Sequence, residues 1–423
     1  MNRVLKQGPE AVLQGRLLFC AVVIVGAFVV FGVRLFQLQI VEGEVLQRRS
    51  DQNSIRTLRL EAPRGEVFDR EGRILATTRP AFGLWAVPSD MRHADRTFRV
   101  LAQLTDRDPE WFRERIESLG RSKRHQQVLL IDDLPFDVLA RVEAHLYALP
   151  GITTAVQPRR HYPQGAMAAH LIGSIGEVRA DQLERETFAD YRAGEVIGQS
   201  GLESRFQAHL RGRAGGRNVV VDAAGRTVQV VDEISAVRGG RLILTLDLDL
   251  QEEAEAAFAS TPDKGPKPGA AVVVDVRNGD ILAMVSRPGY DPNAFAGGID
   301  AETWDALSND EWEPLQNRAT QTHYPPGSTY KAIVAAALLE DGIVDRESKV
   351  FCPGHFRFGR RNYRCWKRPG HGWVNLKRAL KESCDVYFYT FGVKLGIDRL
   401  AHYASAFGLG RRPGLLLGQE ATG

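Results

Sequence analysis

The sequence lacks any long run of basic residues, and this absence limits the class of partner. Its 423 residues hold 55 Lys and Arg against 52 Asp and Glu, a formal net charge of +3, with arginine scattered along the chain. A protein that follows a phosphate backbone needs a concentrated basic stripe, so we do not expect nucleic acid as a partner. The remaining composition, 43% hydrophobic and 25% charged, is that of an ordinary globular protein. The length predicts two or three domains.

Charge is absent from the 17 residues between Arg16 and Arg34. A helix over this stretch is about 26 Å long, enough to span the hydrocarbon layer if Arg34 extends its charged end to the interface. A cleaved signal peptide is the alternative, but the run is longer than a usual signal core and no small-x-small cleavage site follows it. We predict a cytoplasmic tail over residues 1–16, one transmembrane helix over 17–40, and export of the rest.

Residues 41–236 are predicted to form a pedestal domain with structural and partner-binding duties. The segment 56–76 is typical of strand, turn and strand, with Gly72 at a tight turn. Apolar residues at helical spacing predict helices within 97–127 and 135–149. The segment 211–217, rich in Arg and Gly, indicates a flexible loop. No titratable cluster stands out in this region.

The composition changes at Arg238-Gly-Gly-Arg, and residues 237–423 are predicted to form a second domain. Residues 242–251 indicate a strand that continues into a helix reaching about Ala259, and a linker rich in Pro, Lys and Gly follows over 261–269. Two β-rich runs then flank Asn278-Gly279, a strong hairpin signal. A strand, a helix, a hairpin and further helices predict an antiparallel sheet covered by helices, an α+β fold.

Ser328 and Lys331 form the pattern that points most directly to chemistry. They lie in Tyr324-Pro-Pro-Gly-Ser-Thr-Tyr-Lys, where the prolines and the glycine favour a helix that begins at Ser328. Positions three apart share one helical face, so the amine is within reach of the hydroxyl. A partly desolvated amine serves as a general base for an acyl-transfer serine. An isolated Ser-x-x-Lys is more often a serine near a helix start followed by a solvated lysine.

A second hydroxyl and a carboxylate follow about fifty residues later. Ser383 and Asp385, in Glu382-Ser-Cys-Asp, have a spacing suited to relaying a proton or orienting Lys331. The alternative is a helix N-cap, because Ser and Asp are both favoured there. The order and spacing of the two motifs carry more weight than either one.

The chain resembles the class B penicillin-binding proteins, and within them the penicillin-binding protein 2 branch of the rod-elongation machinery, over nearly all of its length. The resemblance rests on the predicted anchor and on motifs in family order: Ala62-Pro-Arg-Gly-Glu-Val-Phe-Asp-Arg-Glu-Gly-Arg-Ile-Leu-Ala, His161-Tyr-Pro-Gln-Gly, Ala169-His-Leu-Ile-Gly, Gly198-Gln-Ser-Gly-Leu-Glu, Gly269-Ala-Ala-Val-Val-Val-Asp-Val, Asn317-Arg-Ala and Tyr324-Pro-Pro-Gly-Ser-Thr-Tyr-Lys.

The resemblance implies a peptidoglycan D,D-transpeptidase that cross-links stem pentapeptides for cell-wall elongation and rod shape, and that β-lactams acylate. It implies that Ser328 is the nucleophile, Lys331 its base and Ser383 a proton-shuttling hydroxyl. It also implies a single-pass protein of the bacterial inner membrane whose bulk is periplasmic. The expected partner is the SEDS-family glycan polymerase of the elongation complex.

Two departures from the family pattern stand out. The second motif ends in Asp385 instead of Asn, which leaves the role of Asp385 less defined than that of Ser383. No Lys-Thr-Gly or Lys-Ser-Gly occurs in the sequence, although that motif supplies the substrate-binding strand and part of the oxyanion hole. We therefore interpret the sequence as a transpeptidase that is incomplete at its C-terminus, and we expect it to be inactive in this form.

Three of the four cysteines, Cys352, Cys365 and Cys384, fall within 33 residues, with His371 between the last two. Three Cys and one His make a complete tetrahedral zinc set. A disulfide between Cys352 and Cys365 is the alternative in an oxidising compartment, and spacing alone favours neither. The resemblance favours structural zinc, because some relatives carry a metal at this loop. His355 and His323 are the alternative ligands to His371.

Other functions share the same motifs. A D,D-carboxypeptidase would use the same serine with water as acceptor, and the sequence does not separate it from a transpeptidase. A β-lactam sensor would be acylated in the same way, although sensors typically place several spans before the penicillin-binding domain. A non-enzymatic activator of a glycan polymerase would act through the anchor and the pedestal alone.

Overall fold

The computed structural model describes residues 9–43, 55–91, 93–117, 127–192, 194–221, 227–259, 267–415, 417–418 and 420–422. Half of the predicted cytoplasmic tail and most of the predicted linker over 261–269 lie outside these residues. The chain divides into two compact units. Unit 1 comprises Met1–Pro63, Phe82–Gln157 and Gly212–Arg238, and unit 2 comprises Arg64–Ala81, Pro158–Arg211 and Gly239–Gly423.

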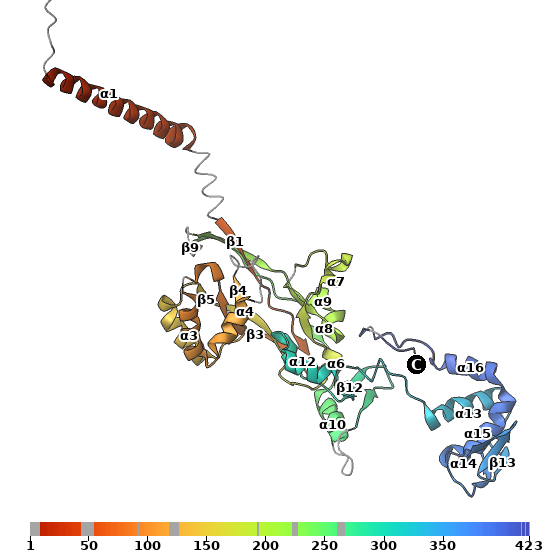
Figure 1. Ribbon diagram of the computed structural model, residues 1–423. Helices are drawn as coiled ribbons and strands as arrows, with labels where there is room; N and C mark the ends of the chain where they lie inside the picture. Colours follow the sequence, from red (N-terminus) through yellow and green to blue (C-terminus); the bar gives the residue numbers. More distant parts are fainter. Residues whose placement is uncertain are drawn as a thin grey trace, which may run out of the picture. The chain divides into compact units, whose positions relative to one another are not determined.

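A long apolar helix begins the described chain. It is α1 (Pro9–Phe36), which continues as the π-helical turn η1 (Gln37–Val41) and is drawn in dark red in Figure 1. Residues 16–41 form the one helix of the described residues that is long and apolar enough to cross a membrane, and an 18-residue window within it has a mean hydropathy of 2.6. Its apolar side chains, Leu18 and Phe28 among them, are exposed along the whole span. The predicted span over 17–40 therefore falls on a helix with an apolar surface on every side.

Unit 1 holds a three-stranded antiparallel sheet and a helical layer. The sheet has the order β1 (Ile55–Leu60), β8 (Gly215–Val221), β9 (Thr227–Ile234). In the same unit, the end of β3 (Ile74–Ala86) pairs with β4 (Val128–Ile131). Three helices, α3 (Ala94–Thr105), α4 (Pro109–Glu117) and α5 (Phe136–His145), overlap the segments that were predicted to be helical. Their core is the apolar cluster of Leu84, Phe98, Leu101, Phe112 and Val142. The short helices η2 (Pro88–Asp90) and η4 (Leu146–Ala148) complete this part.

Gly215, Gly216 and Arg217 of the predicted flexible loop belong instead to strand β8, so the prediction over 211–217 is wrong for these three residues. Gly215 pairs with Leu60 of β1. On the other side of β8, Gly216 pairs with Ile234 of β9. A Cβ atom at Gly215 would lie 2.2 Å from the carbonyl oxygen of Ile234. Glycine is required here because the neighbouring backbone approaches closely, not because the chain must bend freely.

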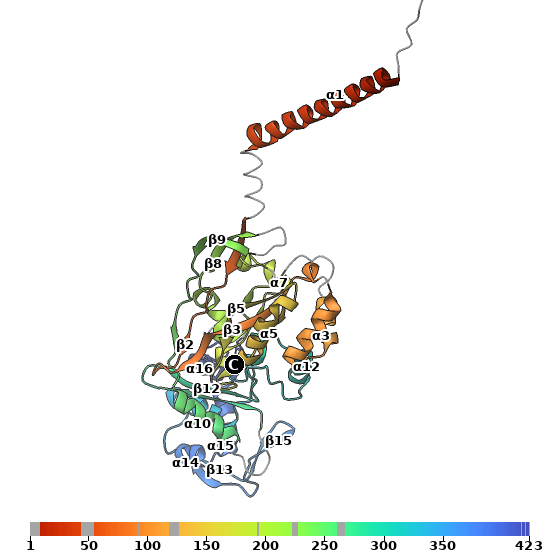
Figure 2. The same ribbon diagram turned by 90° about the vertical axis from the view of Figure 1, so that its left-hand side faces the viewer.

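The first part of unit 2 contains short strands and the first helix of the domain that was predicted over residues 237–423. β2 (Val67–Phe68) pairs in parallel with β10 (Leu242–Ile243) and antiparallel with β3, and the intervening Gly72 has a φ of +86°, as a tight turn requires. α10 (Leu248–Ala259) contacts β12 (Ile281–Arg287) of the hairpin that β12 forms with β11 (Gly269–Val274). The predicted hairpin at Asn278-Gly279 is confirmed, and so is the strand followed by a helix. Figure 2 labels α10 and β12 of this part.

β5 (Ile152–His161) begins in unit 1, and its residues after Gln157 belong to unit 2. The remaining elements of this part are short: α6 (Ala169–Ile172), β6 (Ile175–Glu177), α7 (Ala180–Leu183), η5 (Glu186–Phe188), β7 (Val196–Gly198), α8 (Gly201–Arg205), α9 (Gln207–Leu210), α11 (Asn293–Ala296) and α12 (Ala301–Ser308). They enclose a core that includes Val67, Leu75, Leu171, Leu246 and Met284. Segments far apart in the sequence therefore share one apolar cluster.

A buried ionic cluster lies beside that core. The carboxylate of Glu203, with no exposed surface, accepts hydrogen bonds from Arg64 Nε at 2.5 Å, Arg160 Nε at 2.6 Å and the Tyr162 hydroxyl at 3.2 Å. Burial alone would raise the pKa of Glu203, but the two guanidinium groups outweigh it and the pKa is lowered. The carboxylate is therefore held as an anion between two cations.

The rest of unit 2 is a helical cluster with two small strand pairs. η6 (Gly327–Thr329) leads into α13 (Tyr330–Glu340), and α14 (Leu376–Lys381), α15 (Asp385–Leu395) and α16 (Ile397–Ala406) follow. β13 (Lys349–Cys352) pairs with β16 (Gly372–Asn375), and β14 (His355–Phe358) pairs with β15 (Arg361–Arg364). The core includes Leu338, Val374, Tyr387 and Phe391. The mixture of helices and mainly antiparallel strands agrees with the predicted α+β class.

Candidate active site

Ser328 lies in the first turn of the helix that carries Lys331. The prolines and Gly327, whose φ is +56°, lead into the 3₁₀ turn η6, and the α-helix follows from Tyr330. The helical segment thus begins one residue before the predicted start at Ser328. The hydroxyl of Ser328 is exposed, whereas the side chain of Lys331 is only 13% exposed. An exposed hydroxyl beside a largely buried amine is consistent with the predicted roles of nucleophile and base.

Ser383 occupies the short connection between α14 and α15. Its φ of +52° is left-handed, which is uncommon for a residue with a side chain. Such a conformation persists only where the surroundings hold it, and the next residue, Cys384, is fully buried at the N-cap of α15. The strained backbone therefore directs the Ser383 hydroxyl toward α13.

A continuous set of hydrogen bonds joins the four predicted catalytic residues. The hydroxyl oxygens of Ser328 and Ser383 are 2.7 Å apart, and Lys331 Nζ lies 2.9 Å from Ser383 Oγ. Lys331 Nζ also donates to the Ser383 carbonyl at 3.0 Å and to Asp385 Oδ1 at 2.5 Å. Lys331 thus contacts Ser328 through the hydroxyl of Ser383, where the sequence predicted a direct approach of the amine to Ser328.

The chemistry of the partners decides which way a proton moves along this set. Two acceptors of Lys331, the Ser383 carbonyl and the Asp385 carboxylate, only accept hydrogen bonds, whereas the Ser383 hydroxyl both donates and accepts. A neutral amine at this position would give its two N–H groups to those two oxygens and turn its lone pair to the Ser383 hydroxyl. The Ser383 hydroxyl would then donate to that lone pair and accept a hydrogen bond from the Ser328 hydroxyl.

Trp366 is a residue that the sequence reasoning missed. Its backbone N–H donates to Asp385 Oδ2 at 3.0 Å, and its indole Nε1–H donates to the Glu382 carbonyl at 3.0 Å. Asp385 is thereby held at one oxygen by Lys331 and at the other by the backbone of Trp366. The available signal was its position directly after Cys365, because a residue next to a predicted metal ligand would be held in place together with that ligand.

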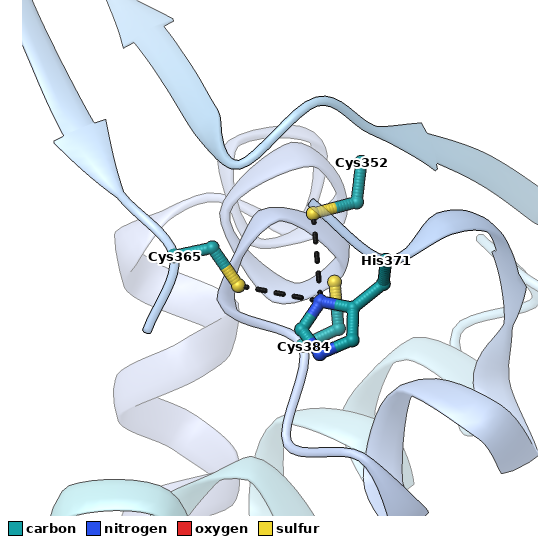
Figure 3. A group of neighbouring side chains, drawn as sticks. All are labelled: Cys352, Cys365, His371 and Cys384. Carbon is teal, nitrogen blue, oxygen red and sulfur yellow. Dashed lines mark hydrogen bonds between the residues drawn. The ribbon is translucent and has the colours of Figure 1, made fainter. Parts of the chain in front are cut away.

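The four predicted metal ligands lie together in a buried cluster, shown in Figure 3. The ligand atoms of Cys352, Cys365, His371 and Cys384 are all within 4.8 Å of one another. His371 Nδ1 is 3.6 Å from the sulfur of Cys352 and 3.5 Å from that of Cys365. The alternative ligands His355 and His323 are exposed and do not belong to this group.

The distances fit a tetrahedral metal better than a disulfide. With Zn–S near 2.3 Å and Zn–N near 2.0–2.1 Å, a tetrahedral site separates nitrogen and sulfur by about 3.5–3.6 Å. The cysteines are free thiols, so the alternative disulfide between Cys352 and Cys365 is not formed. Burial raises the pKa of the Cys384 thiol to about 12. A thiolate at this buried position therefore needs a cation beside it.

Two family models match most of the chain. The penicillin-binding protein dimerisation domain matches residues 59–244, and the penicillin-binding protein transpeptidase domain matches residues 269–423. Ser328, Lys331, Ser383 and Asp385 all fall within the second match. The chain belongs to the penicillin-binding proteins.

Similar proteins agree with this family. The peptidoglycan D,D-transpeptidase MrdA of Escherichia coli K12 is 35% identical over 92% of this chain, and that of Acinetobacter baumannii is 32% identical over 99%. The structure of a penicillin-binding protein (PBP2) in complex with MreC from Helicobacter pylori matches with a TM-score of 0.73 at 29% identity. That match covers 87% of this chain and 68% of the other. The chain spans 62% of the length of both MrdA proteins.

Proposed function

We propose that the protein containing this chain is a peptidoglycan D,D-transpeptidase that acts through an acyl-enzyme on Ser328. The observation that carries the proposal is the unbroken path from the Ser328 hydroxyl through the Ser383 hydroxyl to the Lys331 amine, with steps of 2.7 and 2.9 Å. The transpeptidase family match and the names of the MrdA relatives support the same reaction.

In the proposed reaction, Ser328 Oγ attacks the carbonyl carbon of the penultimate D-Ala of a stem pentapeptide. Its proton passes to Ser383 while the proton of Ser383 passes to Lys331 Nζ, so the hydroxyl of Ser383 is restored. The terminal D-Ala leaves with a proton returned along the same path, and an ester on Ser328 remains. An amine of a neighbouring stem peptide then attacks the ester carbonyl, its proton passes along the same path to Ser328 Oγ, and Ser328 leaves as the amide cross-link forms.

The acyl-enzyme step is tested with penicillin, which reacts with the serine in the same way. Intact-mass and peptide mass spectrometry of the treated protein should place one adduct on Ser328 and none on the Ser328→Ala variant. An adduct on a different residue would overturn the proposal. Assay of cross-linked product against released D-Ala separates the transpeptidase from the D,D-carboxypeptidase, in which water replaces the acceptor amine.

We also propose that Cys352, Cys365, His371 and Cys384 hold a structural zinc ion. When bound, zinc would stabilise the thiolates and fix the loop that carries Trp366. The loop's own residues then act on the site, because the Trp366 N–H orients Asp385 and Cys384 holds Ser383 in its left-handed backbone. Chelation should release about one zinc per chain, lower the melting temperature and slow penicillin acylation. Unchanged melting and acylation after complete metal removal would contradict this role.

The membrane and partner assignments are proposals of the same kind. We infer that α1 anchors the protein in the inner membrane with its bulk in the periplasm, because the apolar side chains of its membrane-length stretch are exposed among the residues that the structure describes. A SEDS-family glycan polymerase is the proposed partner, and the relative solved with MreC indicates that such proteins join larger assemblies. Ser328→Ala distinguishes catalysis from scaffolding, since a scaffold would retain cell growth and rod shape in that variant.

A further inference from the structure

One segment of unit 2 is far more basic than the chain as a whole. Residues 349–381 contain no Asp or Glu, although the chain has 52 of them. The same 33 residues hold ten cations: Lys349, Arg357, Arg360, Arg361, Arg364, Lys367, Arg368, Lys377, Arg378 and Lys381. The view of arginine as merely scattered is therefore wrong for this segment. Such a concentration attracts anionic groups, because no neighbouring carboxylate within the segment neutralises it.

The strand pair β13 and β16 presents one face of this segment to solvent. Side chains alternate along both strands, so Val350, Cys352 and Val374 face the apolar core. Lys349 lies opposite Asn375, and Phe351 lies opposite Trp373, on the other face. Trp373 is 64% exposed and Phe351 is 54% exposed, with their rings in edge contact at 5.6 Å. Two adjacent exposed aromatic rings on a small sheet are typical of a binding surface.

A pocket of about 620 Å³ opens on this face, lined by Lys349, Trp373, Asn375 and Arg378. Arg378 is already oriented, since its guanidinium donates to the Trp373 carbonyl at 2.9 Å and to Glu382 Oε1 at 2.7 Å. Lys349 makes no ion pair with any residue that the structure describes. An aromatic ring, an amide and two cations at one pocket form the small set of polar groups that fixes a ligand's orientation.

The chemistry of these side chains selects a ligand that carries both sugar rings and carboxylates. The apolar face of a sugar ring packs on an exposed indole, and the amide of Asn375 matches its hydroxyl or N-acetyl groups. Carboxylates are bound by Lys and Arg through charge-assisted hydrogen bonds. Uncross-linked peptidoglycan combines both features, because its glycan carries stem peptides with free carboxylates.

The pocket also lies within reach of the reacting serine. Arg378 is in α14, and Ser383 lies two residues after the end of that helix. Between them, the side chain of Glu382 accepts a hydrogen bond from Arg378, and the Glu382 carbonyl accepts one from Trp366. At 1.5 Å per helical residue, the start of α14 is about 10 Å from Ser383 along the chain. An extended stem of five residues spans about 17 Å. A glycan held at the pocket could therefore present its own stem peptide to Ser328.

We propose that the pocket formed by Lys349, Trp373, Asn375 and Arg378 is a binding site for uncross-linked peptidoglycan, with a sugar ring on Trp373 and a carboxylate between Lys349 and Arg378. This site rests on the proposed transpeptidase function, which it extends by naming where the polymeric part of the substrate binds.

The test measures binding of soluble, uncross-linked glycan strands with pentapeptide stems to the Ser328→Ala protein, in which no acyl-enzyme contributes. Trp373→Ala and Lys349→Glu should each weaken binding about tenfold, and the double variant more. For glycan strands whose carboxyl groups have been amidated, Lys349 should no longer contribute to the binding affinity. The Lys349 effect should shrink at high salt, because the charge pair is exposed to solvent.

Matched changes elsewhere in unit 2 control for loss of charge or of an aromatic ring. Lys394→Glu on α15 and Trp304→Ala on α12 alter exposed side chains outside the pocket, and binding should stay within twofold. The melting temperature of each variant shows that it folds. Equal loss in the pocket and control variants, or full binding by the double variant, would overturn the site. So would binding of phosphatidylglycerol vesicles in place of the strands.

Acylation of the unmodified protein by penicillin is measured in parallel and reports on the transpeptidase proposal alone. A protein that is acylated on Ser328 but whose strand binding ignores Trp373 and Lys349 keeps its proposed function and loses this site. A protein that is not acylated on Ser328 loses the proposed function, whatever it binds.

Discussion

Two clusters in unit 2 each hold a carboxylate against basic side chains, and they differ in what surrounds them. Glu203 has no exposed surface and is enclosed by Arg64, Arg160 and Tyr162. Asp385 is 20% exposed and meets Lys331, which is 13% exposed and in turn contacts the hydroxyl of Ser383. The first cluster contains only ion pairs and a phenol, whereas the second ends at the exposed hydroxyl of Ser328.

The difference shows how one kind of contact serves two purposes. In the Glu203 cluster the carboxylate is surrounded by fixed donors, so any proton movement would leave a buried charge unpaired. In the Asp385 cluster the middle position is a hydroxyl that both donates and accepts, so a proton can pass without an unpaired charge. We expect the enclosed cluster to govern stability and the open cluster to govern reaction rate.

Replacing Lys331 should break the open cluster with the largest effect on rate. Lys331→Met keeps the length of the side chain but removes the amine that receives the proton from Ser383. Penicillin acylation should slow by about 10³-fold or more, while the free energy of unfolding changes by only about 1 kcal/mol. Stopped-flow acylation and denaturant unfolding measure the two quantities.

Lys394→Met, on the exposed part of α15, is the matched control for Lys331→Met and should leave both quantities unchanged. If Lys331→Met lowered stability by several kcal/mol and acylation only slightly, the two clusters would not differ in the way proposed.

Replacing Glu203 should have the opposite profile. Glu203→Gln leaves Arg64 and Arg160 buried without an anion, which costs about 3–5 kcal/mol of unfolding free energy. Because the folded pKa of Glu203 lies below its unfolded value, its stabilisation is present above the unfolded pKa and is lost as pH falls through the folded pKa. Denaturant unfolding across acidic pH measures both effects.

Asp181→Asn is the control for Glu203→Gln, because Asp181 pairs with Arg179 and Arg185 at the surface. That change should leave the free energy of unfolding nearly unchanged, because the pair is exposed to solvent. If the two variants lost similar amounts of unfolding free energy, burial of the Glu203 cluster would contribute nothing to stability.

His170 extends the comparison, because it is a largely buried titratable group and no anion among the described residues contributes to its pKa shift. Burial lowers its pKa from 6.5 to about 4, although its Nε2–H donates to the Pro314 carbonyl at 2.7 Å. The folded state therefore needs a neutral ring, and stability should be lost as pH falls from about 6.5 toward 4. The expected loss is about 2–3 kcal/mol.

The control for this pH effect is His170→Gln, which keeps a donor but cannot titrate. Its unfolding free energy should fall less steeply than that of the unmodified protein between pH 6.5 and 4. Parallel pH profiles for the two proteins would contradict the assignment to His170.

Much of the active-site region could be predicted from local sequence, because its pattern lies within short segments. The spacing of Ser328 and Lys331 predicted a shared helical face, and three cysteines with His371 predicted the group that lies together in Figure 3. The position of Ser383 between Ser328 and Lys331 could not be predicted. It depends on the left-handed backbone of Ser383 and on packing across 55 residues of sequence.

The ionic cluster and the strand β8 show where local patterns fail. Glu203 meets Arg64 and Arg160 across 139 and 43 residues, and none of the three carries a local sign of its partner. Gly215 and Gly216 suggested flexibility because the close approach of a neighbouring strand is invisible in sequence. The α+β class was still predictable, since helix and strand periodicities and the Asn278-Gly279 turn are local features.

The relay through Ser383 is the central claim, and the acylation rate of Ser383→Ala tests it most directly. Loss of the hydroxyl removes the link between Ser328 and Lys331 without removing the nucleophile or the base. Penicillin acylation of Ser328 should therefore slow by about 10²–10³-fold in a variant that retains its melting temperature. Acylation within about threefold of the unmodified rate would show that the proton leaves Ser328 by another path.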